Sequence, residues 1–327
     1  MTTTDFAEFH DELRAVAGDL LGKERTADWA VLVDAGWTGL EVPDRLGGAG
    51  ATFAETAVIL GQIGRAAADT TGYLGAVLAV GALNILPDNA VRDDMLTSLV
   101  IGDALPAVAG SGFTLDGTRL CGRAEFVPDA AGADRLLILL GDAIAVVDAA
   151  QLTVTAQPVV DATRHLATVT ADAAEVTAVF GADPGPVRHR AEVALACDSL
   201  GIAEQMLSAT VDHVTLRHQF GRPIGSFQAV KHACADMLVA VEAGRRLVAD
   251  AVAAVAEGAD AAVPAARAKA YACSAAVDIA GKAMQLHGGI GYTWESGIHT
   301  YLKRAALNRS LFGSPATLRR RLSQRYR

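Results

Sequence analysis

The chain has 327 residues, of which 51% are hydrophobic and 20% charged, so its composition predicts a globular protein and excludes an intrinsically disordered one. Its formal net charge is −9, which argues against general nucleic-acid binding because phosphate recognition needs clustered cations. The one basic stretch, residues 319–327, is typical of a solvated helix end, where cations are favoured.

The cysteines and the terminal sequence indicate a cellular setting. The four cysteines are far apart and form no C-x-x-C pair, so we expect neither a metal site nor a disulfide framework. This pattern fits a reducing compartment, and we expect the protein to be cytoplasmic. The start, MTTTDFAEFHDEL, lacks the basic and apolar regions of a signal peptide. The uncharged stretch 70–87 approaches the length of a membrane helix, but its glycines and Pro87 predict a buried helix of a globular core, and we expect no membrane contact.

The first third of the chain has helical periodicity. Apolar residues recur at helical spacing over 5–21 and again from 52 to about 101. Between these helical stretches, GWTGLEVPDRLGGAG (36–50) is rich in glycine and proline and predicts a loop. We therefore expect a helical domain over residues 1–104.

The middle of the chain changes to strand-like sequence. The segment LDGTRLCGRAEFV (115–127) carries an Asp-Gly turn between two short runs, and β-branched runs follow to about Val179. The segment GADPGP (181–186) predicts a linker. A small, shortened β-domain over residues 105–182 is the expectation.

The last third is helical again. Apolar residues from Val193 to Val214 step by three or four positions and predict one long helix. Ser226 is a candidate N-cap for the next helix, Gly258 its candidate end, and Pro264 an early residue of a third helix. A fourth helix is expected after HGGIGYTWE (287–295). The sequence thus predicts an α+β, mainly α protein with a C-terminal four-helix bundle over residues 183–327.

Two motifs in the bundle, together with the N-terminal loop, resemble a known family. RHQFGRPIGSFQAVKHACADM (217–237) and QLHGGIGYTWESGIHTYLKR (285–304) resemble the R-x-x-F-G…F-Q…A-D-M and Q-x-x-G-G-x-G-Y patterns of acyl-CoA dehydrogenases. The loop GWTGLEVPDRLGGAG resembles that family's G-W-x-G-L-x-V-P-E-x-L-G-G. Three ordered matches cover almost the whole chain, and they imply a helical domain, a β-domain and a four-helix bundle.

The resemblance also implies a chemistry. In this family FAD lies at a subunit interface, and the neighbouring subunit's bundle holds its adenosine and diphosphate. A glutamate removes the α-proton of an acyl-CoA, and the β-hydrogen leaves as hydride to the flavin. The cofactor-binding residues implied here are Arg217, Phe220, Gln228, Gln285, Gly288 and Gly289.

The residue types suit that task, and each has a simpler explanation. Arg217 offers a planar charged fork to a diphosphate, or a surface ion pair. Gly288 and Gly289 permit close backbone approach to phosphate oxygens, or only a tight turn. Phe220 packs on the cofactor or in the core, and the two glutamines bond adenosine or an interior polar group.

The positions of the catalytic base depart from the family. Where the family's last helix carries its glutamate, this chain has Phe312, which cannot accept a proton. Some members place the base at the start of the first bundle helix, and that position is Ala191. The neighbouring Glu192 is turned about 100° away on a helix and is expected to be an exposed helix-start residue. No catalytic residue and no metal ligand is therefore predicted.

The β-domain departs as well. The family's K-x-W-I-T segment, which contacts the flavin ring, corresponds to RAEFVPD, with Phe126 at the tryptophan and Pro128 at the threonine position. Proline has neither a hydroxyl nor an amide hydrogen. The half of the pattern that binds the distal end of FAD is kept, and the half that supports the chemistry is lost.

A divided pattern of this kind suggests a heteromer. The resemblance is to the short, glutamate-less subunits of actinobacterial acyl-CoA dehydrogenases for steroid-derived CoA esters. It implies a second acyl-CoA dehydrogenase subunit, an α2β2 heterotetramer, an acyl-CoA substrate and an electron-transfer flavoprotein or similar acceptor. Two alternatives stay open: a homomeric enzyme with a displaced base such as Glu192 or Asp198, and a non-redox scaffold that binds no flavin.

Overall fold

The computed structural model describes residues 3–325, except for the side chains of 3–8 and 23–24, and resolves two compact units. One consists of residues 26–56 and 69–191, and the other of residues up to 25, 57–68 and from 192 onward. The fold is α+β and mainly helical, as the sequence predicts. The three domain ranges 1–104, 105–182 and 183–327 stay a prediction.

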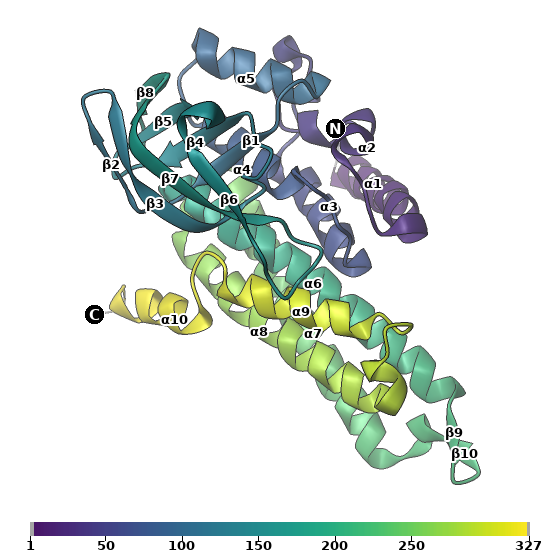
Figure 1. Cartoon of the computed structure of the whole chain (residues 1–327). Helices are drawn as coiled ribbons and strands as arrows, with labels where there is room; N and C mark the ends of the chain where they lie inside the picture. The colour runs from purple at the N-terminus through teal and green to yellow at the C-terminus, as the bar shows by residue number, and fades with distance from the viewer. Residues whose placement is uncertain (1–2, 326–327) are drawn as a thin grey trace. The chain divides into compact units, whose positions relative to one another are not determined.

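Two four-stranded sheets dominate the first unit (Figure 1). Their order is β1-β4-β5-β8 and β2-β3-β7-β6, and alternate residues of both sheets enter one apolar core. The expected hairpin turn is confirmed, since Asp116 pairs with Arg119 and Gly117 has φ 59°. The strands are β1 (Pro106–Ala109), β2 (Phe113–Asp116), β3 (Arg119–Pro128), β4 (Arg135–Leu139), β5 (Ala143–Asp148), β6 (Thr153–Gln157), β7 (Leu166–Glu175) and β8 (Ala178–Gly181).

Helices α2 (Trp29–Asp34), α4 (Tyr73–Asn84) and α5 (Ala90–Ile101) complete this unit. Every residue of α4 from Tyr73 to Leu83 is buried, which confirms that the uncharged stretch is a core helix. Within the described part of the chain, no helix combines the length and apolar character that crossing a membrane requires. The expected glycine-rich loop contains two short 3₁₀ turns, η1 (Trp37–Gly39) and η2 (Asp44–Leu46).

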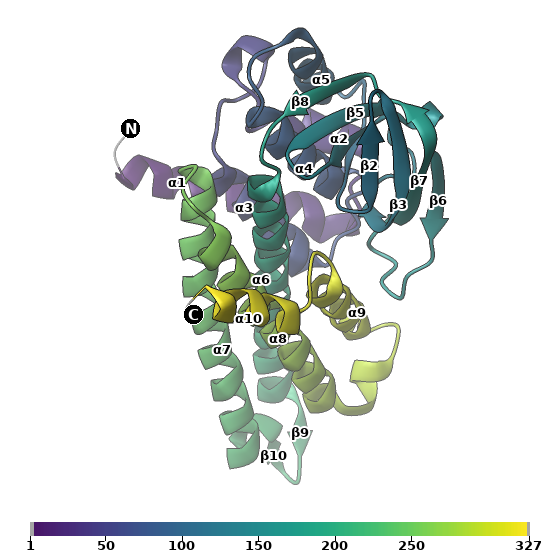
Figure 2. The ribbon, with the colours of Figure 1, turned by 90° about the vertical axis from the view of Figure 1, so that its left-hand side faces the viewer.

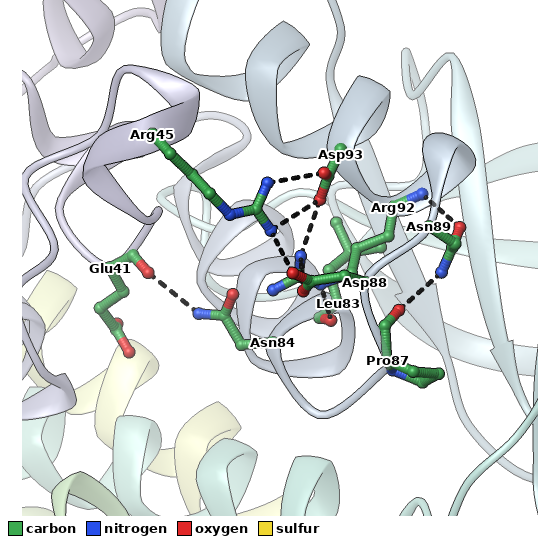
Figure 3. Close-up of polar contacts among 9 residues, drawn as sticks. All are labelled: Glu41, Arg45, Leu83, Asn84, Pro87, Asp88, Asn89, Arg92 and Asp93. Atoms are coloured by element: carbon green, nitrogen blue, oxygen red, sulfur yellow. Dashed lines mark hydrogen bonds and ion pairs between the residues drawn. The ribbon is translucent and has the colours of Figure 1, made fainter.

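The connection between α4 and α5 is fixed by one buried arginine (Figure 3). The Arg92 side chain donates to the Leu83 carbonyl at 3.0 Å and to the carboxylates of Asp88 and Asp93 at 2.8 and 2.7 Å. Arg45, from η2, also binds both aspartates. This network holds the glycine-rich loop against the connection between α4 and α5, because Arg45 from the loop and Arg92 from α5 bind the same two carboxylates, those of Asp88 and Asp93.

The second unit is a helical bundle (Figures 1 and 2). It contains α1 (Thr3–Glu24), most of α3 (Phe53–Ala66) and most of α6 (Gly185–Leu216), followed by α7 (Gln228–Ala256), α8 (Ala262–His287), α9 (Ile298–Ser310) and α10 (Pro315–Gln324). Gly258, at φ 65°, ends α7, and Pro264 lies in the first turn of α8, as predicted. The bundle core is rich in alanine and is completed by Ile202, Met206, Ile279 and Tyr301.

Two local predictions about this region were wrong. Phe227, not Ser226, is the N-cap of α7, because residues 224–226 form a 3₁₀ turn, and the Ser226 hydroxyl has no hydrogen-bond partner. Helix α6 already begins at Gly185, inside the predicted linker. The basic C-terminal stretch lies at the end of a separate helix, α10, after a break at residues 311–314, and its described arginines are exposed, as predicted. Arg321 and the C-cap Arg325 each form an ion pair as well. Residues 326–327 of that basic stretch lie outside the described residues.

A buried ion pair lies at the centre of the bundle. Arg304 on α9 and Asp198 on α6 are both fully buried, and the guanidinium donates to the carboxylate at 3.0 and 2.7 Å. Arg304 also donates to the Ala68 carbonyl at 2.8 Å, and Asn308 donates to Asp198 at 2.6 Å. Helix α3 approaches here so closely that a Cβ at Gly64 would lie 1.9 Å from the Asp198 carbonyl oxygen.

We predict that Arg304→Ala lowers the free energy of unfolding by about 3–5 kcal/mol, because it leaves the Asp198 carboxylate buried without its cation. Chemical denaturation of the full chain measures the change. Arg309→Ala, an exposed position on the same helix, serves as the control and should change the free energy by less than about 0.5 kcal/mol. Equal effects of the two substitutions would contradict the role given to the pair.

Candidate cofactor site

Arg217 directly follows the last turn of α6. Its backbone N–H donates to the His213 carbonyl at 2.9 Å and its own carbonyl accepts from Ile224 N–H at 2.8 Å, so its backbone is fixed on both sides. The side chain is exposed, and no carboxylate within the described residues forms an ion pair with it. The alternative of a surface ion pair is therefore not seen within this chain, and the guanidinium is available to an anion from elsewhere.

The hairpin after Arg217 presents Phe220 to solvent. Strands β9 (His218–Gln219) and β10 (Arg222–Pro223) pair antiparallel, and Phe220 at their turn has φ 54° and is 89% exposed. Core packing of this ring, the second alternative, is thus excluded within this chain. Arg222 is occupied differently from Arg217, since its guanidinium lies 4.2 Å from the centroid of the Phe227 ring. Gln228 begins α7 after a 3₁₀ turn at residues 224–226 that follows the hairpin, and it is exposed.

The end of α8 carries the second motif. Gln285 lies in its last turn, is exposed and accepts from the Lys282 ammonium at 3.0 Å. Gly288 caps the helix with φ 63°, and Gly289 follows in the 3₁₀ turn η5 (Gly288–Tyr292). A Cβ on either glycine would meet no atom within 4 Å, whereas one on Gly291 would lie 2.6 Å from the Met284 carbonyl oxygen. The first two glycines thus leave open space at the backbone, and Gly291 permits close packing.

Two histidines join the two motifs, and sequence reasoning missed both. The rings of His213, one turn before Arg217, and His287, directly before Gly288, stack with centroids 4.2 Å apart and planes 25° apart. His287 Nδ1 lies 2.8 Å from the Ala283 carbonyl oxygen, so this nitrogen carries a proton. Figures 1 and 2 both place the β9–β10 hairpin and the α8–α9 connection at the same end of the bundle. The signal in the sequence was the position of the histidines: His213 stands four residues before Arg217, and His287 stands directly before Gly288.

The three predicted anchor segments therefore meet at one end of the bundle. They offer an unpaired guanidinium, two open glycines and two exposed amide side chains, which together match an extended anionic nucleotide. Among the residues that the structure describes, no group of His, Cys, Asp and Glu side chains is arranged to hold a metal ion. This donor set fits FAD, because the open space at Gly288 and Gly289 leaves room for phosphate oxygens at the backbone.

The predicted base positions hold no carboxylate. Ala191 is buried on α6, and Phe312 is half-buried with φ 50° in the turn between α9 and α10. That turn is anchored by the buried Lys269, whose ammonium donates to the Gly313 carbonyl at 2.7 Å. Burial lowers the pKa of Lys269.

Glu192 was predicted to be exposed, and this was wrong. It is 3% exposed, and both its carboxylate oxygens accept from the Arg321 guanidinium, at 2.8 and 2.6 Å. The added helix α10 covers it, which the sequence pattern of α6 alone does not indicate. Of the two candidates for a displaced base, Glu192 and Asp198, both are therefore buried and bound to an arginine.

The segment at the flavin-ring position lies in the other compact unit. Phe126 in β3 has φ 57°, and its N–H donates to the Gln157 side chain at 2.7 Å. A register shift interrupts the β3–β7 pairing between Ala124 and Val127, and Pro128 pairs with Leu166. Phe126 is thus held on a β-bulge, a feature that often re-aims side chains.

Comparison with known proteins identifies the family. Family models for the acyl-CoA dehydrogenase N-terminal and C-terminal domains match residues 3–103 and 189–326. The acyl-CoA dehydrogenase IpdE2 of Mycobacterium tuberculosis is 35% identical over 304 residues, covering 90% of this chain and 85% of that protein. The chain belongs to the acyl-CoA dehydrogenase family. Its relatives are oxidoreductases whose cofactor is FAD, so the predicted family, enzyme class and cofactor are confirmed.

Two solved heteromeric acyl-CoA dehydrogenases are similar to this chain. A Tcur3481–Tcur3483 steroid ACAD variant aligns with TM-score 0.89 and 27% identity, covering 97% of both chains. The ChsE4–ChsE5 complex of Mycobacterium tuberculosis aligns with TM-score 0.88 and 27% identity, covering 99% of this chain and 97% of that one. The similarity extends over 97% and 99% of this chain, so the chain shares the fold of those relatives.

We predict that Phe312→Glu creates no dehydrogenase in the isolated chain, because a carboxylate has no reaction to assist unless thioester and flavin ring are aligned. Steady-state turnover with an artificial electron acceptor measures this. Phe312→Gln, which changes shape equally without adding a base, is the matched control for loss of packing. Turnover by the lone Glu variant, absent from the Gln variant, would show that this chain holds a complete flavin site.

Proposed function

We propose that this chain is the non-catalytic subunit of a heteromeric acyl-CoA dehydrogenase. In this proposal its bundle holds the adenosine and diphosphate end of an FAD whose ring lies in a second, longer acyl-CoA dehydrogenase subunit. That partner supplies the glutamate that removes the α-proton of an acyl-CoA. When bound, FAD would supply the acceptor for the β-hydrogen as hydride, and an electron-transfer flavoprotein or similar acceptor would take up the electrons. The assembly is an α2β2 heterotetramer.

The observation that carries the proposal is the state of the two remaining candidate carboxylates. Asp198 is bound by Arg304 and Asn308, and Glu192 by Arg321. Both carboxylates are buried and their oxygens are held by a guanidinium, so neither is free to reach the α-carbon of a bound thioester. With Ala191 and Phe312 at the family's base positions, a homomeric enzyme with a displaced base is disfavoured.

Each cofactor-binding residue has a defined role in the proposal. Arg217 pairs its fork with the diphosphate, and Gly288 and Gly289 let the phosphate oxygens reach the backbone. Gln228 and Gln285 bond the adenosine half, the latter after exchanging its contact with Lys282. Phe220 packs on the cofactor. An exposed arginine without an ion-pair partner beside two open glycines is unusual for a pure scaffold, which disfavours the alternative without flavin.

The same end of the bundle exposes a group of large apolar side chains. They flank the hairpin and η5: Leu216, Phe220, Ile290, Tyr292 and Trp294, exposed by 51% to 89%. Exposed apolar groups gathered around polar anchors are typical of a protein interface. They support a partner subunit that covers this end together with the FAD it carries.

The substrate class and location complete the proposal. The relatives include a steroid ACAD, and on that analogy we assign a bulky, steroid-derived CoA thioester as the substrate. The four cysteines have free thiols, which supports the reducing cytoplasm.

Reconstitution tests the division of labour. The pure chain should be colourless and should not reduce added FAD when steroid-derived or straight-chain acyl-CoA esters are present. Co-purified with its partner subunit, it should yield a yellow complex whose flavin bleaches with the right ester. Bleaching by the lone chain would support a displaced base, and a colourless complex would support a scaffold.

We predict that Arg217→Ala weakens FAD binding by the assembled complex at least about ten-fold without unfolding the subunit, because a charged hydrogen bond contributes about 1.5–3 kcal/mol. Release of FAD fluorescence on dilution measures the affinity. Arg217→Lys should recover only part of it, since the fork geometry is lost. The control Arg246→Ala removes an exposed arginine on α7 and should leave the affinity unchanged. Unaltered FAD affinity in the Arg217→Ala complex would contradict the assignment.

A further inference from the structure

The stacked histidines connect the two anchor segments directly, one ring from the end of α6 and one from the end of α8. The His213 carbonyl accepts the N–H of Arg217, and the His287 residue continues into Gly288. Gly291 packs against the same turn, since a Cβ there would lie 3.1 Å from the His287 Cβ. A change in ring separation would therefore move Arg217 relative to the Gly288–Gly289 turn.

Two neighbouring groups act electrostatically on His213. The groups whose charges act on His213 are His287 from α8 and Arg217 from the turn after α6. Partial burial is the largest cause that lowers the pKa of His213 below its usual value near 6.5, and these two neighbours lower it further. The folded arrangement therefore favours the neutral ring. Its contribution to stability is complete above about pH 6.5 and declines as the pH falls below that value.

We propose that His213 and His287 are positioning residues, a stacked pair that holds Arg217 and the Gly288–Gly289 turn in the arrangement that binds the FAD diphosphate. The inference rests on the proposed function and adds residues that the family motifs do not include. Protonation of the His213 ring separates the pair, because Arg217 repels the charged ring. FAD binding by the complex then weakens on acidification, even though acid adds positive charge close to an anion site.

The sign of this effect separates the proposal from the obvious alternative. If the histidines bound the diphosphate directly as cations, acidification would strengthen FAD binding. If they only filled space, replacing both with phenylalanine would preserve whatever pH dependence the complex has. A positioning pair predicts weaker binding at low pH and loss of that dependence in the phenylalanine variants.

The experiment uses the assembled complex with the wild-type chain, with His213→Phe alone and with both histidines changed to Phe. FAD dissociation constants are measured by fluorescence at pH 7.5 and 5.5. We expect the wild-type constant to rise about ten-fold, which corresponds to about 1.4 kcal/mol, and the double variant to change less than about two-fold. His232→Gln, an exposed α7 histidine, should keep the wild-type change.

A second measurement is independent of FAD. Histidine ring resonances of the full chain, titrated by NMR, should show His213 with a pKa below 6.5, rising towards 6.5 in His287→Phe.

An unchanged pH dependence in the double variant, or tighter FAD binding at pH 5.5, overturns the proposal. If single or double variants unfold at pH 7.5, the NMR titration of the wild type alone decides: a His213 pKa at or above 6.5 overturns it. Failure of the wider function is distinguishable, since Arg217→Ala would then leave FAD affinity intact at pH 7.5.

Discussion

The Asp198 carboxylate constrains the bundle more than any other single group, because a buried charge must be neutralised by partners that the fold brings to it. Arg304 and Asn308 on α9 supply the neutralising hydrogen bonds, and Arg304 extends to the Ala68 carbonyl after α3. Three helices are thereby fixed around one carboxylate. Gly64 allows the close backbone approach that this arrangement requires.

The same neutralisation has a chemical consequence. The guanidinium groups that bind Asp198 and Glu192 occupy their oxygens, so the pairs that stabilise the fold also keep the two carboxylates from reaching a substrate. Helix α10 makes this possible for Glu192, because it brings Arg321 over the start of the bundle. The family's base positions hold Ala191 and Phe312, and the two nearby acids, Asp198 and Glu192, are bound in ion pairs that stabilise the fold.

At the end of the bundle that carries the β9–β10 hairpin, charged and apolar groups are left exposed instead of being neutralised or buried. Its arginine Arg217 is left without a carboxylate in the described chain, its glycines leave space, and its aromatic rings are exposed. Helices α6 and α8 both end there, and helix C-termini carry partial negative charge, which is unfavourable for an anion. An anion site at this place therefore depends on a fixed cation, Arg217, and on the backbone position of the Gly288–Gly289 turn. In our proposal the stacked His213 and His287 fix both.

The sequence alone determined the fold class and the family, because helical periodicity and three ordered motifs are properties of short segments. It also determined that Ala191 and Phe312 carry no base, since that depends only on residue type. The burial of Glu192, the failure of Ser226 to cap α7 and the stacking of His213 on His287 were decided by the tertiary structure. Each depends on contacts between residues far apart in the chain: Arg321 lies 129 positions from Glu192, and no local pattern specifies which distant side chain arrives at a given surface.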